Sequence, residues 1–212
     1  MPARGAAQGG DWCETFPIGA DVVALSIGDV CGHGAEAFQA MFWTRQALRD
    51  ASAAGLDPAQ TLAAVDCAIL SEQPELYVTA IFGLLDTRSH TLVFGNAGHP
   101  PPLMAGISGE RFLDFGDGDL LLGVKAAATR TVHVVKVPAE TLLVLYTDGV
   151  VEYRRDTIGA QKRLREAATV AHYHSRLPAA QVIEGQMFLN GSNADDASIL
   201  TARTPGLRFR NA

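Results

Sequence analysis

The sequence has few cysteines, no excess of basic residues and no long apolar run, and each shortage excludes a class of protein. Its three cysteines, Cys13, Cys31 and Cys67, form no CxxC pair and no zinc-ligand spacing, which argues against disulfides and favours a reducing compartment. Lys and Arg total 17 against 23 Asp and Glu, and the formal net charge is -6. A general affinity for nucleic acid or anionic lipid is therefore not expected, because both require clustered basic residues.

No stretch of the chain approaches the roughly 18 continuous apolar residues of a membrane span. The first residues, 1–5, also lack the apolar core of a signal peptide. We therefore expect a cytoplasmic protein that does not enter a membrane.

Catalytic motifs of several hydrolase classes are absent as well. A thiolate phosphatase requires Cys-x5-Arg, but Gly19, Ala37 and Gln73 stand six positions after the three cysteines. The glycine-rich run 28–34 lacks the Gly-Lys-Ser/Thr ending of a P-loop. Neither a Gly-x-Ser-x-Gly elbow nor a His-Glu-x-x-His helix occurs, which argues against acyl hydrolases and zinc proteases.

The chain does have enough apolar residues for one well-packed domain. It has 212 residues, of which 48% are hydrophobic, and it contains no internal repeat and no low-complexity linker. We expect this domain to cover residues 9–204. Residues 1–8 are expected to be a disordered or truncated segment and residues 205–212 a flexible tail, since neither has a periodic pattern.

Hydrophobic periodicity groups the expected helices and strands instead of alternating them. Helices are predicted at 35–53, 58–70, 161–170 and 179–189. Strands are predicted at 21–27, 77–86, 91–96, 111–115, 131–137, 141–147 and 197–202. This grouping favours a layered α+β domain with antiparallel pairing over a doubly wound parallel fold.

Four aspartates stand in turn-like sequences beside apolar residues: Asp11, Asp29, Asp148 and Asp195. An Asp beside a Gly is also common in ordinary turns, so each residue alone is open to that interpretation. Together they favour a site for hard cations, because Mg²⁺ and Mn²⁺ prefer carboxylate, carbonyl and water oxygens. Two such ions can activate a water molecule and neutralise charge on a phosphoryl group.

Five sequence motifs, four of which contain one of these aspartates, follow one another in an order that is typical of one family. They are Gly9–Trp12, Ile27–Gly34, Asn96–Pro102, Leu145–Glu152 and Asp195–Ser198. With these motifs the chain resembles the bacterial PP2C-like (PPM) serine/threonine phosphatases of the SpoIIE/RsbU type, over residues 8–203. Several independent motifs make this resemblance far more specific than any single one.

The resemblance implies a layered sandwich of two antiparallel β-sheets flanked by α-helices, with two Mn²⁺ or Mg²⁺ ions in a cleft at one edge. It implies that Asp29 bridges both ions and that the Val30 carbonyl helps to hold one. Asp148 and Asp195 would hold the second ion, and Asp11 would act on the first, directly or through water. Relatives from eukaryotes carry a third-metal aspartate where this chain has His99, which favours two ions here.

Other residues of the motifs are expected to contact substrate or to support the metal ligands: His33, Asn96, His99, Glu152 and Asp196. His99 is open to two interpretations, a direct contact with phosphate or a loop residue that forms hydrogen bonds and packs. His33 either orients water or substrate or closes its glycine-bracketed loop, and the loop role is favoured. Glu152 either supports the site or begins a helix.

Cys31 is an unusual residue beside these ligands. It is either a thiol that makes the site sensitive to oxidation or a small apolar side chain, and the second is the commoner role of such a cysteine.

The resemblance also implies a function and its partners. Members of this type remove phosphate from Ser or Thr of an anti-sigma-factor antagonist in a partner-switching pathway for stress or development. An upstream sensor domain or activator and a homodimer are further partners that the resemblance allows. The alternatives are a catalytically weak regulatory module that binds a phosphorylated partner, and hydrolysis of a small phosphate ester.

The short segment before Asp11 departs from the family pattern. The family has a strand before the Gly-Gly-Asp motif, and residues 1–8 contain no apolar run that could form one. Asp11 is therefore expected to fray from its site, because chain ends are poorly ordered unless a strand or contact holds them. On this view the domain alone is a weak enzyme that an upstream element activates.

Overall fold

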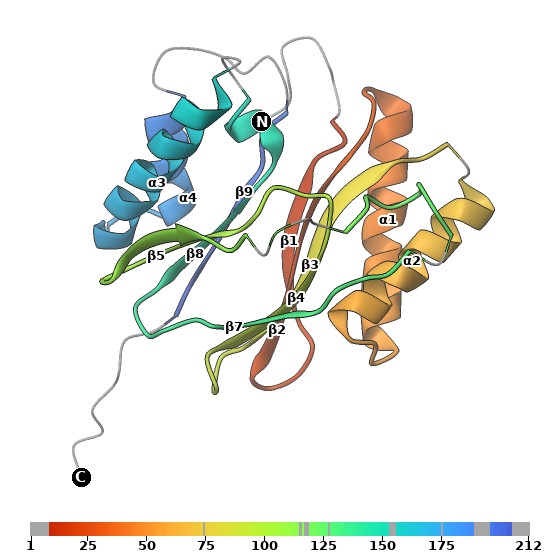
Figure 1. Ribbon diagram of the computed structural model, residues 1–212, viewed down its shortest axis with the longest axis horizontal. Coiled ribbons are helices and arrows are strands. Elements are labelled where there is room, and N and C mark those ends of the chain that lie inside the picture. Colours follow the sequence, from red (N-terminus) through yellow and green to blue (C-terminus); the bar gives the residue numbers. More distant parts are fainter. Residues whose placement is uncertain are drawn as a thin grey trace.

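Two antiparallel β-sheets form the centre of the molecule, and helices cover their outer faces (Figure 1). The computed structural model describes residues 9–73, 75–114, 116, 119–126, 128–152, 156–174, 176–188 and 196–204. The first sheet has the strand order β1 (Trp12–Pro17), β2 (Val22–Val30), β3 (Val78–Asp86), β4 (Thr91–Ala97), β7 (His133–Lys136). The second has the order β6 (Gly109–Phe112), β5 (Leu103–Gly106), β8 (Leu142–Tyr146), β9 (Ile199–Arg203). The predicted layered α+β sandwich is confirmed.

Paired helices lie on each side of the stacked sheets, which gives four layers (Figure 1). Against the first sheet pack α1 (Ala35–Ala53) and α2 (Pro58–Glu72), and against the second pack α3 (Thr157–Tyr173) and α4 (Ala179–Met187). Three apolar clusters fill the spaces between the layers. The central one, between the sheets, includes Ile27, Phe94 and Leu145. Burial of these side chains is the main favourable term that holds the layers together.

Local sequence signals explain where α2 begins. Asp57 accepts a hydrogen bond from the backbone N–H of Gln60, and the Gln60 side chain accepts one from the N–H of Asp57. Pro58 occupies the first turn, where its missing N–H costs nothing. The capping box and the proline together fix the start of α2.

The strand β1 was not predicted, and it changes the expectation for Asp11. It pairs antiparallel with β2 from Trp12 opposite Gly28 to Pro17 opposite Val23. The buried Trp12 indole donates a hydrogen bond to Ser26 Oγ at 2.9 Å. The segment that follows Asp11 is thus part of the sheet and is held by its pairing with β2.

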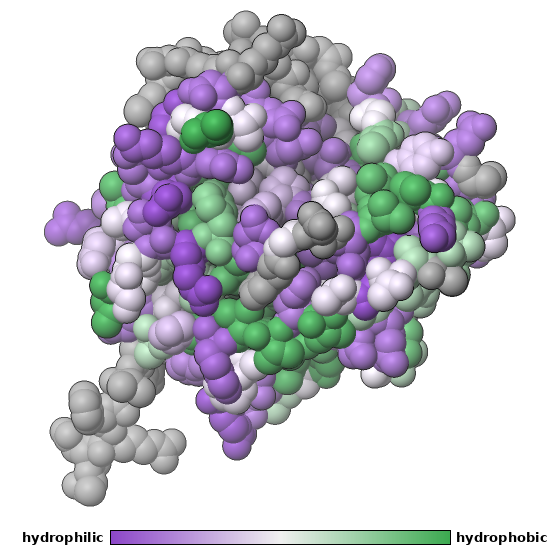
Figure 2. Space-filling view, viewed as in Figure 1, coloured by the Kyte–Doolittle hydropathy of each residue, from purple (hydrophilic) through white to green (hydrophobic). Residues whose placement is uncertain are grey.

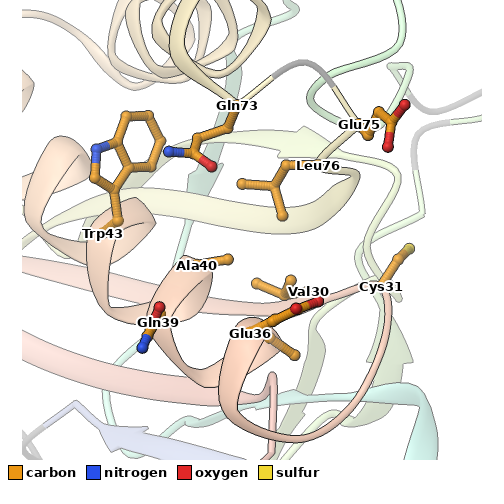
Figure 3. A pocket seen from close by; sticks show the side chains of 10 residues that line it. Val30, Cys31, Glu36, Gln39, Ala40, Trp43, Gln73, Glu75 and Leu76 are labelled. Atoms are coloured by element: carbon orange, nitrogen blue, oxygen red, sulfur yellow. The ribbon is translucent and has the colours of Figure 1, made fainter.

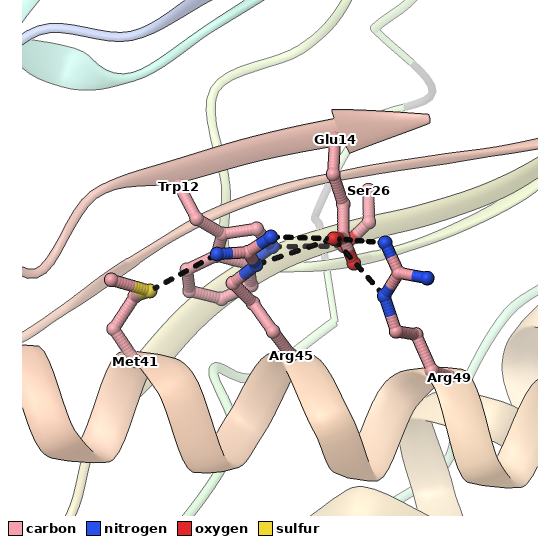
Figure 4. Close-up of polar contacts among 6 residues, drawn as sticks. All are labelled: Trp12, Glu14, Ser26, Met41, Arg45 and Arg49. Carbon is pink, nitrogen blue, oxygen red and sulfur yellow. Dashed lines mark hydrogen bonds and ion pairs between the residues drawn. The ribbon is translucent and has the colours of Figure 1, made fainter. Parts of the chain in front are cut away.

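A cluster of charged side chains fastens β1 to α1 (Figure 4). Glu14 is only 8% exposed, and its Oε2 accepts hydrogen bonds at 2.7 Å from both Arg45 and Arg49. These bonds join two elements that lie 31 and 35 residues apart in the sequence. Charge-assisted bonds of this kind are stronger than neutral ones, so β1 is fixed to α1 as well as to β2.

The remaining elements differ from the prediction mainly at their ends. The strand β5 was not predicted, and β6 begins at Gly109 instead of 111. The helix α3 is longer at both ends than the predicted 161–170, and β9 begins at Ile199 instead of 197. The expected segments 1–8 and 205–212 lie outside the described residues.

Hydrophilic residues cover most of the face shown in Figure 2, where hydrophobic residues form separate patches. One patch lies in the region of β7, where Val132 and Val134 are 41% and 66% exposed. This strand and β1 are at opposite edges of the first sheet, so the patch is not part of the region around Asp11. Among the described residues, no helix is both long and apolar enough to pass through a bilayer.

Candidate metal centre

Four segments that are far apart in the sequence meet at one edge of the sandwich. Asp11 directly precedes β1, and Asp29 lies near the end of β2, so the pairing of Trp12 with Gly28 brings them onto neighbouring strands. In the second sheet, Asp148 begins the short helix η1 (Asp148–Val150) after β8, and Asp196 precedes β9. The pairing of β8 with β9 brings these two segments together.

The glycines of the motifs allow this close approach. A Cβ on Gly9 would collide with the Asp196 carboxylate, and a Cβ on Gly149 would collide with the Asp196 carbonyl. A Cβ on Gly10 would lie 2.6 Å from the Val30 carbonyl oxygen, closer than real Cβ atoms come. Glycine is therefore required at Gly10 and Gly149, where neighbouring backbone occupies the space of a side chain, and at Gly9 it leaves room for the Asp196 carboxylate.

Thr147 connects the two sheets at this edge, and its role was not predicted. Its Oγ1 donates a 2.6 Å hydrogen bond to Asp11 Oδ2 and accepts a 2.8 Å bond from the backbone N–H of Ser198. These partners are 136 and 51 residues away, so no local pattern indicates them. The only signal is its place directly before Asp148. The hydroxyl therefore fixes the orientation of the Asp11 carboxylate.

The carboxylates at this edge repel one another. Burial, and after it the charges of Asp196 and Asp148, raise the pKa of Asp11 from 3.8 to about 6, although the hydrogen bonds with Thr147 and Asp29 act in the opposite direction. An ordinary aspartate would be fully ionised well below this value. A bound cation would relieve the repulsion and favour the ionised form.

Cys31 lies close enough to this cluster to respond to its charge. Burial raises the pKa of the Cys31 thiol, and the Asp29 and Asp148 carboxylates raise it further. Because the thiolate is the reactive form, these neighbours make the thiol less reactive than a free cysteine, although it is exposed.

The oxygen atoms available here fit a hard cation in their chemistry. They comprise the carboxylates of Asp11, Asp29, Asp148 and Asp196, with the Val30 carbonyl beside Gly10. Asp195 lies outside the described residues. In the part of the chain that the structure describes, no three His, Cys, Asp or Glu side chains are close enough to form a complete ligand group. The assignment of each ligand thus stays a prediction.

His99 is buried, and both of its ring nitrogens have protein partners. Nε2 lies 3.1 Å from the Tyr146 carbonyl and therefore carries the proton, while Nδ1 lies 2.9 Å from the Thr79 hydroxyl. Burial lowers the pKa of His99 to about 3, so the ring is neutral. Thr79 lies on β3 and Tyr146 on β8, so His99 joins the two sheets.

Asn96 braces the turn that carries His99. Its Oδ1 accepts a bond from the His99 N–H at 2.8 Å, and its Nδ2 donates to the His99 carbonyl at 2.9 Å. Both bonds are to backbone, so this Asn fixes the loop between β4 and β5.

His33 and Glu152 lie near the cluster in sequence, and both are exposed. His33 is in the loop between β2 and α1. The backbone N–H of Glu152 donates to the Asp148 carbonyl at 2.8 Å, which places Glu152 directly after the turn formed by η1. The roles of the two side chains toward substrate stay predictions.

Two stacked antiparallel sheets between paired helices, with aspartates at one edge, define the PP2C-like phosphatase fold. The PP2C phosphatase domain of SpoIIE from Bacillus subtilis superposes with a TM-score of 0.84 at 18% identity, covering 98% of this chain and 62% of that one. The RsbU and RsbW domains of Rv1364c from Mycobacterium tuberculosis superpose with a TM-score of 0.81 at 27% identity, covering 98% and 59%.

The sequence model of the family described as Stage II sporulation protein E (SpoIIE) matches residues 19–205. The chain therefore belongs to the SpoIIE family, and the resemblance noted in its motifs is confirmed. A curated relative, protein IcfG of Synechocystis, is 26% identical over 232 residues, which cover 94% of this chain. This chain spans only 36% of the length of IcfG.

Proposed function

We propose that this domain is a metal-dependent protein phosphatase that hydrolyses phosphoserine and phosphothreonine. The observation that carries the proposal is the meeting of carboxylates from four segments, in which burial and neighbouring charges raise the pKa of Asp11 to about 6. Mutual repulsion of this kind costs stability, and it is expected where a cation is to be bound.

The chain's own residues provide the ligands. Asp11, Asp29 and the Val30 carbonyl would hold one Mn²⁺ or Mg²⁺, and Asp29, Asp148 and Asp195 the other. When bound, the two ions would activate a water molecule and offset the charge that develops on the phosphoryl group. Thr147 keeps Asp11 oriented through its 2.6 Å hydrogen bond, so little rearrangement is needed when the ion enters.

Membership of the SpoIIE family supports a proposed substrate and setting. We infer a phosphorylated anti-sigma-factor antagonist as substrate, in a cytoplasmic partner-switching pathway that responds to stress or development. An upstream sensor domain or activator would regulate the domain, since the chain spans 59% and 62% of the two solved relatives and they contain further regions.

Phosphate release from a phosphoserine protein or peptide, with and without Mn²⁺, tests the proposal. We expect turnover that requires added Mn²⁺ or Mg²⁺ and stops on chelation. Activity that survives exhaustive chelation would refute the metal-dependent reaction. Tight binding of the phosphoprotein without turnover at any metal concentration would instead identify a regulatory binding module.

A further inference from the structure

A pocket of about 700 Å³ lies between α1 and the segment that follows α2 (Figure 3). Val30 and Cys31 line it where β2 ends, so the pocket begins next to the proposed metal ligands. Cys31 directly follows Asp29 and Val30 in the chain, so this end of the pocket is close to the acidic cluster. A molecule bound at the cluster could therefore continue into the pocket.

The walls of the pocket are held in place by the core. Trp43 of α1 and Leu76 pack against the apolar cluster beneath α1 and α2. The backbone N–H of Cys31 donates to the Tyr77 carbonyl at 2.9 Å, which fastens the loop after β2 to the segment after α2. The pocket is preformed, as binding sites usually are.

The chemistry of the pocket changes along its length. Figure 3 shows Cys31 and Glu75 on one side and Trp43 on the other, with Glu36 beside Val30. Glu36 and Glu75 are exposed, and neither forms an ion pair with another described side chain. The side nearest the aspartates thus carries two carboxylates, and the far side presents the half-buried Trp43 with Leu76.

We propose that this pocket binds the part of the protein substrate that flanks the phosphorylated residue. A Lys or Arg of the substrate pairs with Glu36 and Glu75, and an apolar side chain packs on Trp43 and Leu76. Charge complementarity supports this occupant, because two carboxylates that no described side chain neutralises attract a cationic side chain. The inference rests on the proposed phosphatase function and adds the sequence context that the domain selects.

The length of the pocket determines which residues of a bound substrate can contact it. From Glu36 to Trp43 is seven residues, or about 10 Å along the axis of α1. An extended peptide covers this distance with about three residues. With the phosphate at the aspartates, the selected side chains lie within roughly four positions of the phosphorylated residue.

Steady-state kinetics with two kinds of substrate test this inference. Phosphoserine peptides carry Lys, Ala or Glu at each position up to four residues from the phosphoserine, and p-nitrophenyl phosphate is a small ester without flanking residues. The readout is the ratio of kcat/KM for each peptide to kcat/KM for the ester, in Mn²⁺. We expect the Lys peptides to have the highest ratio at one or two positions.

Substitutions of pocket residues then show which side chains cause the preference for particular flanking residues. The double variant Glu36→Gln, Glu75→Gln should lower the ratio for the Lys peptide by about three- to tenfold and leave the Ala peptide nearly unchanged. Trp43→Ala should lower the ratio for peptides with an apolar flank by about fivefold. Matched controls are Glu72→Gln and Phe42→Ala, which change a carboxylate and an aromatic ring outside this pocket and should leave the ratios as they are.

Three other results are possible, and each of them would contradict the pocket inference or the proposed phosphatase function. If the enzyme hydrolyses both substrates without regard to the flanking residues, the pocket inference fails and the phosphatase function stands. If the pocket variants lower kcat/KM equally for the peptide and for p-nitrophenyl phosphate, these residues act on the metal centre and the inference also fails. If the unmodified domain hydrolyses neither substrate at any Mn²⁺ concentration, the proposed function fails and the inference with it.

Discussion

Two carboxylates only three positions apart, Asp11 and Glu14, lie in opposite electrostatic surroundings. Glu14 is buried and accepts hydrogen bonds from the guanidinium groups of Arg45 and Arg49. Asp11 lies among further carboxylates, and burial together with Asp196 and Asp148 raises its pKa. A carboxylate surrounded by cations stabilises the fold, whereas one surrounded by carboxylates weakens the metal-free fold and prepares a cation site. Glu14 within β1 thus supports the fold, and Asp11, directly before β1, is a proposed metal ligand.

The largest effect in this comparison is expected for a carboxylate of the cluster. Asp148→Asn should lower metal-dependent turnover at least on the order of a hundredfold, because a bound metal ion supplies several kcal/mol of charge stabilisation. Folding stability should be unchanged or slightly higher, since the substitution relieves repulsion. Turnover and urea denaturation measure both effects. The surface variant Asp21→Asn is the control, and near-normal turnover of Asp148→Asn would place this residue outside the centre.

At Glu14, in contrast, we expect a substitution to lower the stability of the fold. Glu14→Gln removes the negative charge that two arginines share, and the arginine side chains are 30% and 40% exposed. We therefore expect a loss of about 2 kcal/mol in the free energy of unfolding, less than for a fully buried pair. Urea denaturation in chelator gives the value. Arg88→Gln, which breaks the exposed pair with Asp21, should cost under about 0.5 kcal/mol. If Glu14→Gln lowered the free energy of unfolding as little as Arg88→Gln does, the contrast between Glu14 and Asp11 would not hold.

A smaller effect is expected at Thr147, which supports Asp11 without being a ligand. Thr147→Val removes the bond to Asp11 and should raise the half-saturating Mn²⁺ concentration about tenfold, as is usual for residues that orient ligands. Thr147→Ser keeps the hydroxyl and should restore most of the affinity. Manganese titrations of activity separate the two variants. Equal half-saturation for Val and Ser would show that the hydroxyl does not position Asp11.

The smallest effect concerns pH. The folded-state pKa of Asp11 is raised from 3.8 to about 6, so the stability from its protonated form is complete below about pH 4 and is lost as the pH rises through 6. For the metal-free domain we expect a loss on the order of 1 kcal/mol over this interval, after allowance for screening. Asp11→Asn should flatten this part of the stability profile measured by urea denaturation. Identical slopes for the two proteins would contradict the shift.

The sequence predicts the layers and the edge of the sandwich that carries the aspartates, because these follow from periodicity and from motifs. It does not reveal β1, since Trp12 and Glu14 point to the same buried side and a charge there breaks the apolar alternation. Only Arg45 and Arg49, which come much later in the chain, make that burial favourable.

Partners that are distant in the sequence also explain why the roles of Thr147 and His99 could not be predicted. The partners of Thr147 come from both ends of the chain, and those of His99 come from both sheets, so no local window contains them. For His99 the sequence leaves contact with phosphate and a structural role equally open. The structure shows two protein partners on the ring and a neutral state.

The assembly of the cluster from residues 11, 29, 148 and 196 has a thermodynamic consequence for the whole domain. These carboxylates come together only when the two sheets are stacked, so a cation that binds them binds the folded chain and not the unfolded one. Linkage then requires that free cation at a hundred times its dissociation constant stabilise the fold by about 2.7 kcal/mol. The ion would hold the two sheets together, and the resistance of the domain to proteolysis would increase with the concentration of free metal.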